Sequence, residues 1–180
     1  MSSKKDVSSE TDLEKILRES RANPVYKKEY KPDRQVIIDG VEVTNHRQSG
    51  FPKLADLRLV LEELVDQKFQ PLAIVVDSTL QFLLEAEESQ ALVEALVPGF
   101  KIPGQLLTVR VFEVKDTETA LKKMLKLALN NNARILSNQN LPQTYSTLTQ
   151  KKLTTFEGKP WQMRYTISDE GTVSLTWDKA

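Results

Sequence analysis

The sequence contains no cysteine and only one histidine, His46. Disulfides, thiolate zinc sites and cysteine nucleophiles are therefore excluded, and so is a metal site built from several histidines. A metal held by this chain would need oxygen ligands, which favours Mg²⁺ or Mn²⁺. A serine–histidine–aspartate triad would depend on His46, and no nucleophile-elbow sequence accompanies that residue.

Long apolar runs and an excess of charge of one sign are also missing. No apolar stretch is long enough to span a bilayer. Residues 1–6 have no apolar core, so we expect no secretory signal and a cytoplasmic protein. The 25 Lys and Arg residues balance the 25 Asp and Glu residues, so nucleic acid would have to be bound through a local basic patch. The length of 180 residues and a hydrophobic content of 39% fit one soluble globular domain.

Apolar runs and amphipathic segments alternate along the middle of the chain. The apolar runs predict strands over 36–39, 72–77, 106–114 and 133–136. Helices are predicted over 53–67, over 78–97 with a break allowed around 85–89, and from 117 to about 130, whereas 40–52 is predicted to be a loop. This order is typical of an α/β protein with a parallel sheet and right-handed crossovers.

Composition divides the chain into three parts. Residues 1–34 form a polar leader, 35–150 the α/β domain, and 151–180 an extension of that domain. The extension predicts an antiparallel β-hairpin, because two alternating segments flank Ser168-Asp169-Glu170-Gly171.

The leader is predicted to hold a short helix over 11–18 and a basic, aromatic stretch over 26–32. Basic residues beside aromatic ones can contact RNA phosphates and bases. The alternative is a leader that is simply solvated.

Carboxylates follow three of the predicted strands. Asp39 ends the first and Asp77 the second, and Asp116 and Glu118 come after the third. Parallel strands end at the same edge of a sheet, which is where open α/β sheets bind their ligands. Carboxylates gathered there repel one another unless a cation neutralises them, and Mg²⁺ is commonly held by carboxylates together with substrate phosphates. The pattern predicts a divalent-metal site that acts on a phosphodiester. At each position the alternative is a turn residue or a helix cap.

The two ends of this domain carry short motifs. The first is Val36-Ile37-Ile38-Asp39-Gly40-Val41-Glu42, which lacks the further glycines of a Walker or dinucleotide loop. The second is Ile135-Leu136-Ser137-Asn138-Gln139-Asn140. Over roughly residues 34–148 the chain resembles the PIN-like nucleases, within them the NYN group close to the Regnase-type ribonucleases. The resemblance implies a three-layer, Rossmann-like PIN fold and a metal-dependent ribonuclease that cleaves single-stranded or looped RNA.

The same resemblance assigns roles to residues of this chain. It implies that Asp39 is the central metal ligand, that Asp116 or Glu118 completes the Mg²⁺ or Mn²⁺ site, and that Asp77 or Glu42 assists. It also implies that Asn138 and Gln139 orient water or substrate. Arg47 and Lys53 are then candidates to hold RNA phosphates.

Two residues depart from the family pattern. Glu42 stands where the family has Asn, and Gln139 stands where it has the closing Asp. Gln139 is neutral and supplies no full negative charge to a metal. The alternative function is therefore a catalytically degenerate PIN-like module that binds RNA or a protein without cleavage. A phosphatase or nucleotide-binding protein that uses the same acidic edge is a third class, and the sequence leaves open whether the chain forms a homo-oligomer.

Overall fold

The computed structural model describes residues 34–47, 50–102, 108–141 and 161–177. The chain separates into two units, Met1–Lys31 and Pro32–Ala180, and all the described residues belong to the second. The helix predicted over 11–18 and the basic, aromatic stretch lie outside the described residues. Within the described part of the chain, no helix is both long and apolar enough to cross a membrane.

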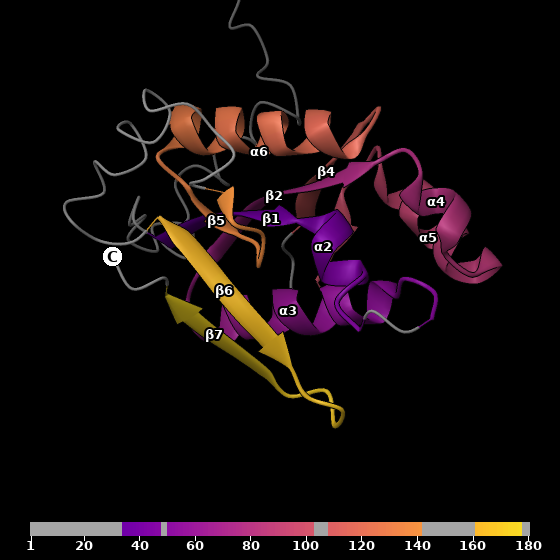
Figure 1. Ribbon diagram of the computed structural model, residues 1–180, viewed down its shortest axis with the longest axis horizontal. Helices are drawn as coiled ribbons and strands as arrows, with labels where there is room; N and C mark the ends of the chain where they lie inside the picture. Colours follow the sequence, from indigo (N-terminus) through magenta and orange to yellow (C-terminus); the bar gives the residue numbers. More distant parts are fainter. Residues whose placement is uncertain (1–33, 48–49, 103–107, 142–160, 178–180) are drawn as a thin grey trace, which may run out of the picture. The chain divides into compact units, whose positions relative to one another are not determined.

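A seven-stranded sheet forms the centre of the domain, in the order β3-β4-β2-β1-β5-β6-β7 (Figure 1). The strands are β1 Gln35–Asp39, β2 Gln70–Asp77, β3 Phe100–Lys101, β4 Thr108–Val114, β5 Arg134–Leu136, β6 Gln162–Ile167 and β7 Val173–Trp177. The five inner strands are parallel, and the short β3 and the terminal β7 are antiparallel to their neighbours. The predicted parallel sheet and C-terminal antiparallel hairpin are both confirmed.

Helices cover both faces of this sheet, as expected for a three-layer α/β domain. Helix α6, Thr117–Asn131, lies on one face, and α3, Leu54–Asp66, lies on the other (Figure 1). The strand alternation decides which side chains meet which helix. Ile74 of β2 packs in the core that contains α3, and its neighbour Val75 packs in the core that contains α6.

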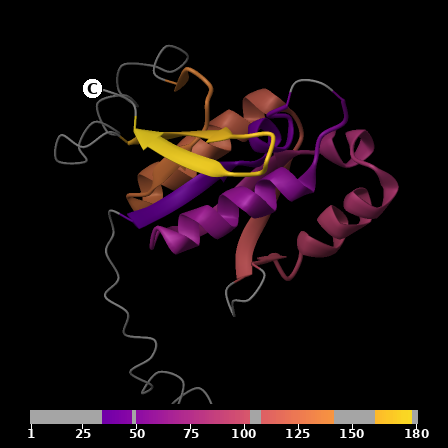
Figure 2. The ribbon, with the colours of Figure 1, turned by 90° about the horizontal axis from the view of Figure 1, so that it is seen from below.

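The C-terminal hairpin is a continuous part of the sheet. Strand β6 pairs in parallel with β5, with Ile135 opposite Gln162 and Leu136 opposite Met163. Strand β7 contacts α3, and Figure 2 shows the hairpin beside that helix. The hairpin therefore covers the edge of β5 and shares the core of α3.

The prediction of a loop over 40–52 is wrong for its first residues, because Gly40–Thr44 form the short helix α2. The Asp39 carboxylate caps this helix by accepting the N–H of Glu42 at 3.1 Å. An Asp followed three residues later by a Glu is a capping-box type of signal. The sequence therefore contained the start of α2, although the segment is only 5 residues long.

The helix predicted over 78–97 is divided into two. Helix α4 spans Leu80–Leu83 and α5 spans Ala86–Ala95. The break falls at Leu84 and Glu85, whose ψ angles of 155° and 154° are extended. Acids in the first turn of α5 favour a new helix start there, because the N-terminal end of a helix dipole attracts negative charge.

Gly40 lets α2 approach β2 closely. A Cβ atom at Gly40 would lie 2.7 Å from both Ile74 Cγ2 and Val76 Cγ1. Both neighbours are β-branched and have little rotamer freedom to move away. Glycine is therefore required by packing directly after Asp39.

We expect Gly40→Ala to lower the free energy of unfolding by about 1–3 kcal/mol through overpacking, measured by urea denaturation. The control is the same substitution in a Val76→Ala background, which removes one of the two opposing methyl groups. The two changes should then be non-additive, with a smaller effect of Gly40→Ala in the double variant. Strict additivity would contradict this steric explanation.

Candidate functional site

Asp39 and Asp77 end adjacent parallel strands at the carboxyl edge of the sheet, as the sequence predicted. Asp39 pairs in register with Val75, so Asp77 lies two residues further along β2. Both side chains are buried, with Asp39 only 1% exposed and Asp77 only 3% exposed. A buried carboxylate needs hydrogen-bond donors or a cation, so their partners show what each acid can do.

Three protein donors surround the Asp39 carboxylate. The N–H of Glu42 donates to Oδ1, and Ser137 Oγ donates to Oδ2 at 2.8 Å. Gln139 Nε2 also donates to Oδ2, at 3.1 Å. A carboxylate offers about four lone-pair sites, so most of its capacity is already used by the protein.

Burial raises the pKa of Asp39 to about 6. The hydrogen bonds from Ser137 and from the N–H of Glu42 oppose this rise, and the negative charges of Glu42 and Asp77 add to it. Asp39 therefore changes its charge near neutral pH, which is typical of functional sites as well as of buried structural acids.

Asp77 is held by hydrogen bonds at the start of α4 and α6. Its Oδ1 accepts the N–H groups of Thr79 and Leu80 and the hydroxyl of Thr79. Its Oδ2 accepts the hydroxyl of Thr117 at 2.8 Å. Burial opposes ionisation, but these hydrogen bonds outweigh it and lower the pKa of Asp77. Asp77 is thus an ionised acid that joins β2 to α6.

Glu42 contacts the C-terminal hairpin. The Tyr165 hydroxyl of β6 donates to Glu42 Oε2 at 2.6 Å, and the N–H of Asn138 donates to the same oxygen at 3.2 Å. Burial, followed by the charge of Glu42, raises the pKa of Tyr165, so the phenol stays a donor. The imidazole of His46 packs beside this ring, with centroids 5.2 Å apart.

Asp116 and Glu118 occupy a different environment from the one predicted. Asp116 is the exposed N-cap of α6 and accepts the N–H of Thr119 at 2.7 Å, which lowers its pKa. Glu118 is exposed and pairs with Lys122 one turn along the helix. In the described segments, no group of three His, Cys, Asp or Glu side chains is placed to hold a metal ion. The expectation that these acids gather with Asp39 and Asp77 into such a group is therefore not met.

The loop that carries Asn138 and Gln139 is held by β6. Gln162 Nε2 donates to the carbonyls of Ser137 and Gln139 at 2.7 and 2.6 Å, and Arg164 donates to the carbonyls of Asn138 and Gln139. The Asn138 amide exchanges two hydrogen bonds with the backbone of Tyr165. Both predicted residues therefore lie at the site, but their backbone is fixed by the hairpin.

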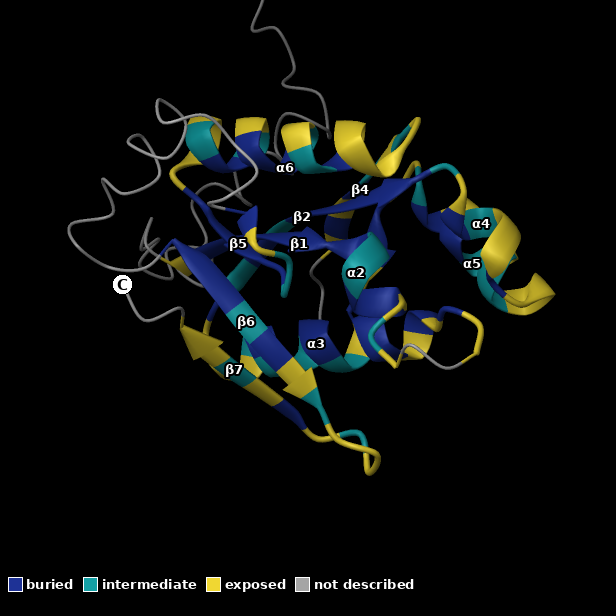
Figure 3. Ribbon diagram, in the orientation of Figure 1, coloured by how far each residue is buried: buried dark blue, intermediate teal, exposed yellow. Residues whose placement is uncertain are grey.

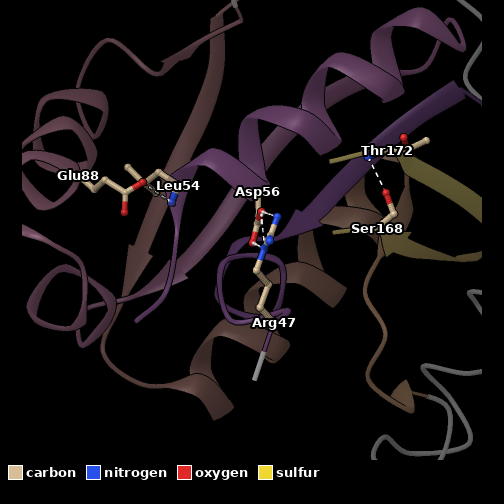
Figure 4. Close-up of polar contacts among 6 residues, drawn as sticks. All are labelled: Arg47, Leu54, Asp56, Glu88, Ser168 and Thr172. Carbon is tan, nitrogen blue, oxygen red and sulfur yellow. Dashed lines mark hydrogen bonds and ion pairs between the residues drawn. The ribbon is translucent and has the colours of Figure 1, made fainter. Parts of the chain in front are cut away.

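The two basic residues predicted to hold phosphates differ in their surroundings. The Arg47 guanidinium forms a fork on the buried carboxylate of Asp56, with Nη2 3.1 Å from Oδ1 (Figure 4). Its flat donor face is thus directed at a carboxylate of α3. Lys53 is exposed, and its backbone N–H donates to the carbonyl of Thr44 beside α2.

The sequence did not predict several hydrogen-bond donors of this site. They are Ser137, Thr117, Gln162, Arg164 and Tyr165. The contact between Tyr165 and Glu42 spans 123 residues, and that between Ser137 and Asp39 spans 98. Neither periodicity nor local spacing reports pairs so far apart. The one local signal was that Ser137 directly follows the apolar strand β5, just as Asp39 follows the apolar residues of β1; Ile38 and Leu136, the residues before them, are paired.

We expect Tyr165→Phe to lower the free energy of unfolding by about 1–2 kcal/mol, because Glu42 loses a donor while the ring packing is kept. Equilibrium urea denaturation measures the change. Glu42→Gln and the double variant complete a double-mutant cycle, in which the coupling should be about 1 kcal/mol. Zero coupling would show that the hydroxyl contact adds nothing to stability.

Comparison with solved structures bears on the fold. The domain is similar to two solved structures of Arabidopsis thaliana nuclear protein-only RNase P 2, PRORP2, each with a TM-score of 0.54 and 19% sequence identity. The matches cover 91% and 92% of this chain. The chain has a PIN-like α/β fold. It spans only about a third of the length of PRORP2, with 35% and 36% of that chain covered. No family model and no curated protein matches the sequence.

The side chains of this PIN-like domain, as arranged, do not fit a resident Mg²⁺ or Mn²⁺. The ion would need open carboxylate oxygens, because Mg²⁺ usually keeps several waters when bound. Asp39 is almost fully buried under three donors, and Asp77 under four. The amide of Gln139 donates to Asp39 Oδ2, an oxygen that would otherwise be available to a metal ion.

Proposed function

We propose that this chain is a PIN-like module that binds RNA without cleaving it. The observation that carries the proposal is the hydrogen bond from Gln139 Nε2 to Asp39 Oδ2. This contact puts a neutral donor where a metal site needs a second negative charge. The remaining acids near Asp39 also have protein partners, Tyr165 and Asn138 for Glu42 and Thr79 and Thr117 for Asp77.

RNA is favoured over other ligands by the fold likeness to an RNase and by exposed cations at the acidic edge. Lys53 lies beside the C-terminal end of α2, and exposed Lys115 precedes α6 at the end of β4. Lys53 directly precedes α3 and Lys115 shortly precedes α6, the helices that cover the two faces of the sheet. Ammonium groups in such positions can hold the phosphates of a strand that crosses the edge without sequence specificity.

The test is fluorescence anisotropy with a labelled, mixed-sequence single-stranded RNA at low and physiological salt. We expect salt-dependent binding that a Lys53→Glu, Lys115→Glu double variant weakens by about tenfold or more. The matched control is a Lys68→Glu, Lys101→Glu double variant at two other exposed lysines outside this edge. Absence of binding, or equal loss in both variants, would contradict an RNA site at this edge.

Cleavage is assayed on the same RNA with millimolar Mg²⁺ or Mn²⁺, and the melting temperature is measured in parallel. The proposal expects intact RNA and no metal-induced rise in melting temperature. RNA cleavage that Asp39→Asn abolishes would overturn it in favour of the second candidate.

That second candidate is a metal-dependent endoribonuclease, and the raised pKa of Asp39 beside Glu42 and Asp77 favours it. Its ion would be Mg²⁺ or Mn²⁺ held by Asp39 with Asp77 or Glu42, and Asp116 or Glu118 would complete the set. Asn138 and Gln139 would orient water or substrate. This candidate requires the hydrogen bonds of Ser137 and Gln139 to Asp39 to open first.

A further inference from the structure

Helices α4 and α5 and the turn after α5 expose several large apolar side chains. Within the described segments, most of the large hydrophobic residues that are exposed lie on these helices or on the turn that follows: Phe82, Leu83, Val93 and Val97. Phe82 is 80% exposed and Val97 is 94% exposed. Such a concentration on one pair of helices is unlike the scattered exposure of single apolar residues on ordinary surfaces.

The opposite faces of the same helices already bury apolar side chains. Leu80 of α4 and Leu92 and Ala95 of α5 belong to the core that contains α3. The exposed residues are therefore an additional apolar surface, beyond what is needed to attach the helices to the domain. Figure 3 shows the exposed side of α4 and α5 at the end of the domain beyond β4.

Hydrogen bonds hold the two helices in one arrangement. Ser89 Oγ of α5 donates to the carbonyl of Gln81 in α4 at 2.7 Å. Glu88 accepts the N–H of Leu54 at 3.0 Å, which ties α5 to the N-terminal end of α3 (Figure 4). The exposed side chains thus stand on a supported pair of helices, which limits the entropy lost when a partner binds.

The charged residues within the segment that forms α4 and α5 have one sign. Between Lys68 and Lys101 the sequence has no Lys, Arg or His, and its acids are Asp77, Glu85, Glu87, Glu88 and Glu94. Glu85, Glu87 and Glu94 are exposed. The Arg58 guanidinium of α3 lies 5.8 Å from the ring centroid of Phe100 in β3, the strand that contacts α5. An acidic and apolar surface repels RNA and complements a cationic, apolar partner.

We propose that α4 and α5 dock a cationic amphipathic helix of a partner protein. Its apolar face would pack on Phe82 and Val97, and its Lys or Arg side chains would lie beside Glu87 and Glu94. This mode is helix-in-groove recognition, in which apolar anchors recur at helical spacing. Lys53 and Lys115 of the proposed RNA site are not among the residues of this docking surface, so the variants that test the two proposals differ.

The test uses the full chain and a synthetic peptide of about 18 residues, in which leucines at i, i+3, i+4 and i+7 form one face and lysines the other. Binding is measured by calorimetry and by NMR chemical-shift changes. We expect the shifts to centre on residues 80–97. Phe82→Ser and Val97→Ser should each weaken binding by about tenfold, which corresponds to roughly 1.4 kcal/mol. Val97→Ser should leave the melting temperature unchanged, because this side chain is almost fully exposed.

Two controls separate docking from general charge attraction. A peptide with the same composition but scattered leucines should bind at least about tenfold more weakly. Glu94→Lys should weaken binding more than Glu170→Lys, which changes an exposed acid in the turn between β6 and β7. Equal binding of the two peptides, equal effects of the two Glu variants, or unchanged binding by Val97→Ser would each overturn the proposal.

Discussion

Gln139→Asp is expected to lower the free energy of unfolding by about 2–3 kcal/mol in metal-free buffer at neutral pH. Gln139 Nε2 donates to Asp39 at 3.1 Å, so the variant replaces a hydrogen bond with a second carboxylate facing a buried one. Two unit charges about 4 Å apart repel by about 4 kcal/mol at an effective dielectric constant near 20. Because the pKa of Asp39 is about 6, its protonation at pH 7 limits the electrostatic cost to about 1.4 kcal/mol, and the lost hydrogen bond adds about 1 kcal/mol. Equilibrium urea denaturation with a chelator measures the loss.

Millimolar Mn²⁺ is expected to restore much of this stability in the variant and to leave the parent protein unchanged. An ion that binds only the folded state stabilises it by about 2.7 kcal/mol at one hundred times its dissociation constant. Gln139→Asn is the matched control, because it shortens the side chain without adding charge and should show no response to Mn²⁺. If Mn²⁺ stabilised the parent protein equally, the acidic edge of the parent would already bind a metal, which would contradict the proposed function.

Asp39→Asn is expected to stabilise the protein at pH 7 by about 2–3 kcal/mol and to have almost no effect at pH 4. The reason is the pKa of Asp39, which burial raises from 3.8 to about 6. The folded state then holds the proton more tightly than the unfolded chain, so Asp39 supports stability below pH 4. That support is lost as the pH rises through about 6. In the Asp39→Asn variant the side chain cannot ionise, so this loss of stability does not occur.

The environment of Asp39 can accept the substitution. The Ser137 hydroxyl can rotate to accept a hydrogen bond, and the Gln139 amide can turn its oxygen towards the new Nδ2. Urea denaturation of both proteins from pH 4 to pH 8 measures the profile. Asp116→Asn is the control, because Asp116 is an exposed cap with a lowered pKa. A pH-independent difference between Asp39→Asn and the parent would contradict the raised pKa.

The strands and the major helices were predictable because their signals are local. Val36–Ile38 and Ile74–Val76 are short apolar runs with β-branched residues, and the leucines of α3 recur at helical spacing, so each pattern matches one element. The bounds of α3, Leu54–Asp66, differ by one residue at each end from the prediction of 53–67. Helix α2 was missed because the capping signal of Asp39 and Glu42 lies in a segment shorter than two turns.

The candidate site was predictable only in part. The sequence placed Asp39 and Asp77 at the same edge, because parallel strands end together. It did not show which donor each acid takes. Asp77 takes the hydroxyl of Thr117, 40 residues away, and Asp116 takes the nearest N–H at its own helix start. Tertiary packing decides whether a carboxylate accepts a hydrogen bond from its own helix start or from a distant residue, and sequence spacing does not report this packing.

The pairing of β6 with β5 has a consequence for the order in which the domain folds. Asp39 receives two of its three donors from residues 98 and 100 positions later, and Glu42 receives the Tyr165 hydroxyl from 123 positions later. During synthesis β1, α2, α3 and β2 leave the ribosome long before these donors exist. Contacts of such long sequence separation form slowly and late. We therefore expect the acidic edge to be the last part of the domain to mature, and a nascent chain halted before Ser137 to carry Asp39 without two of its three hydrogen-bond donors.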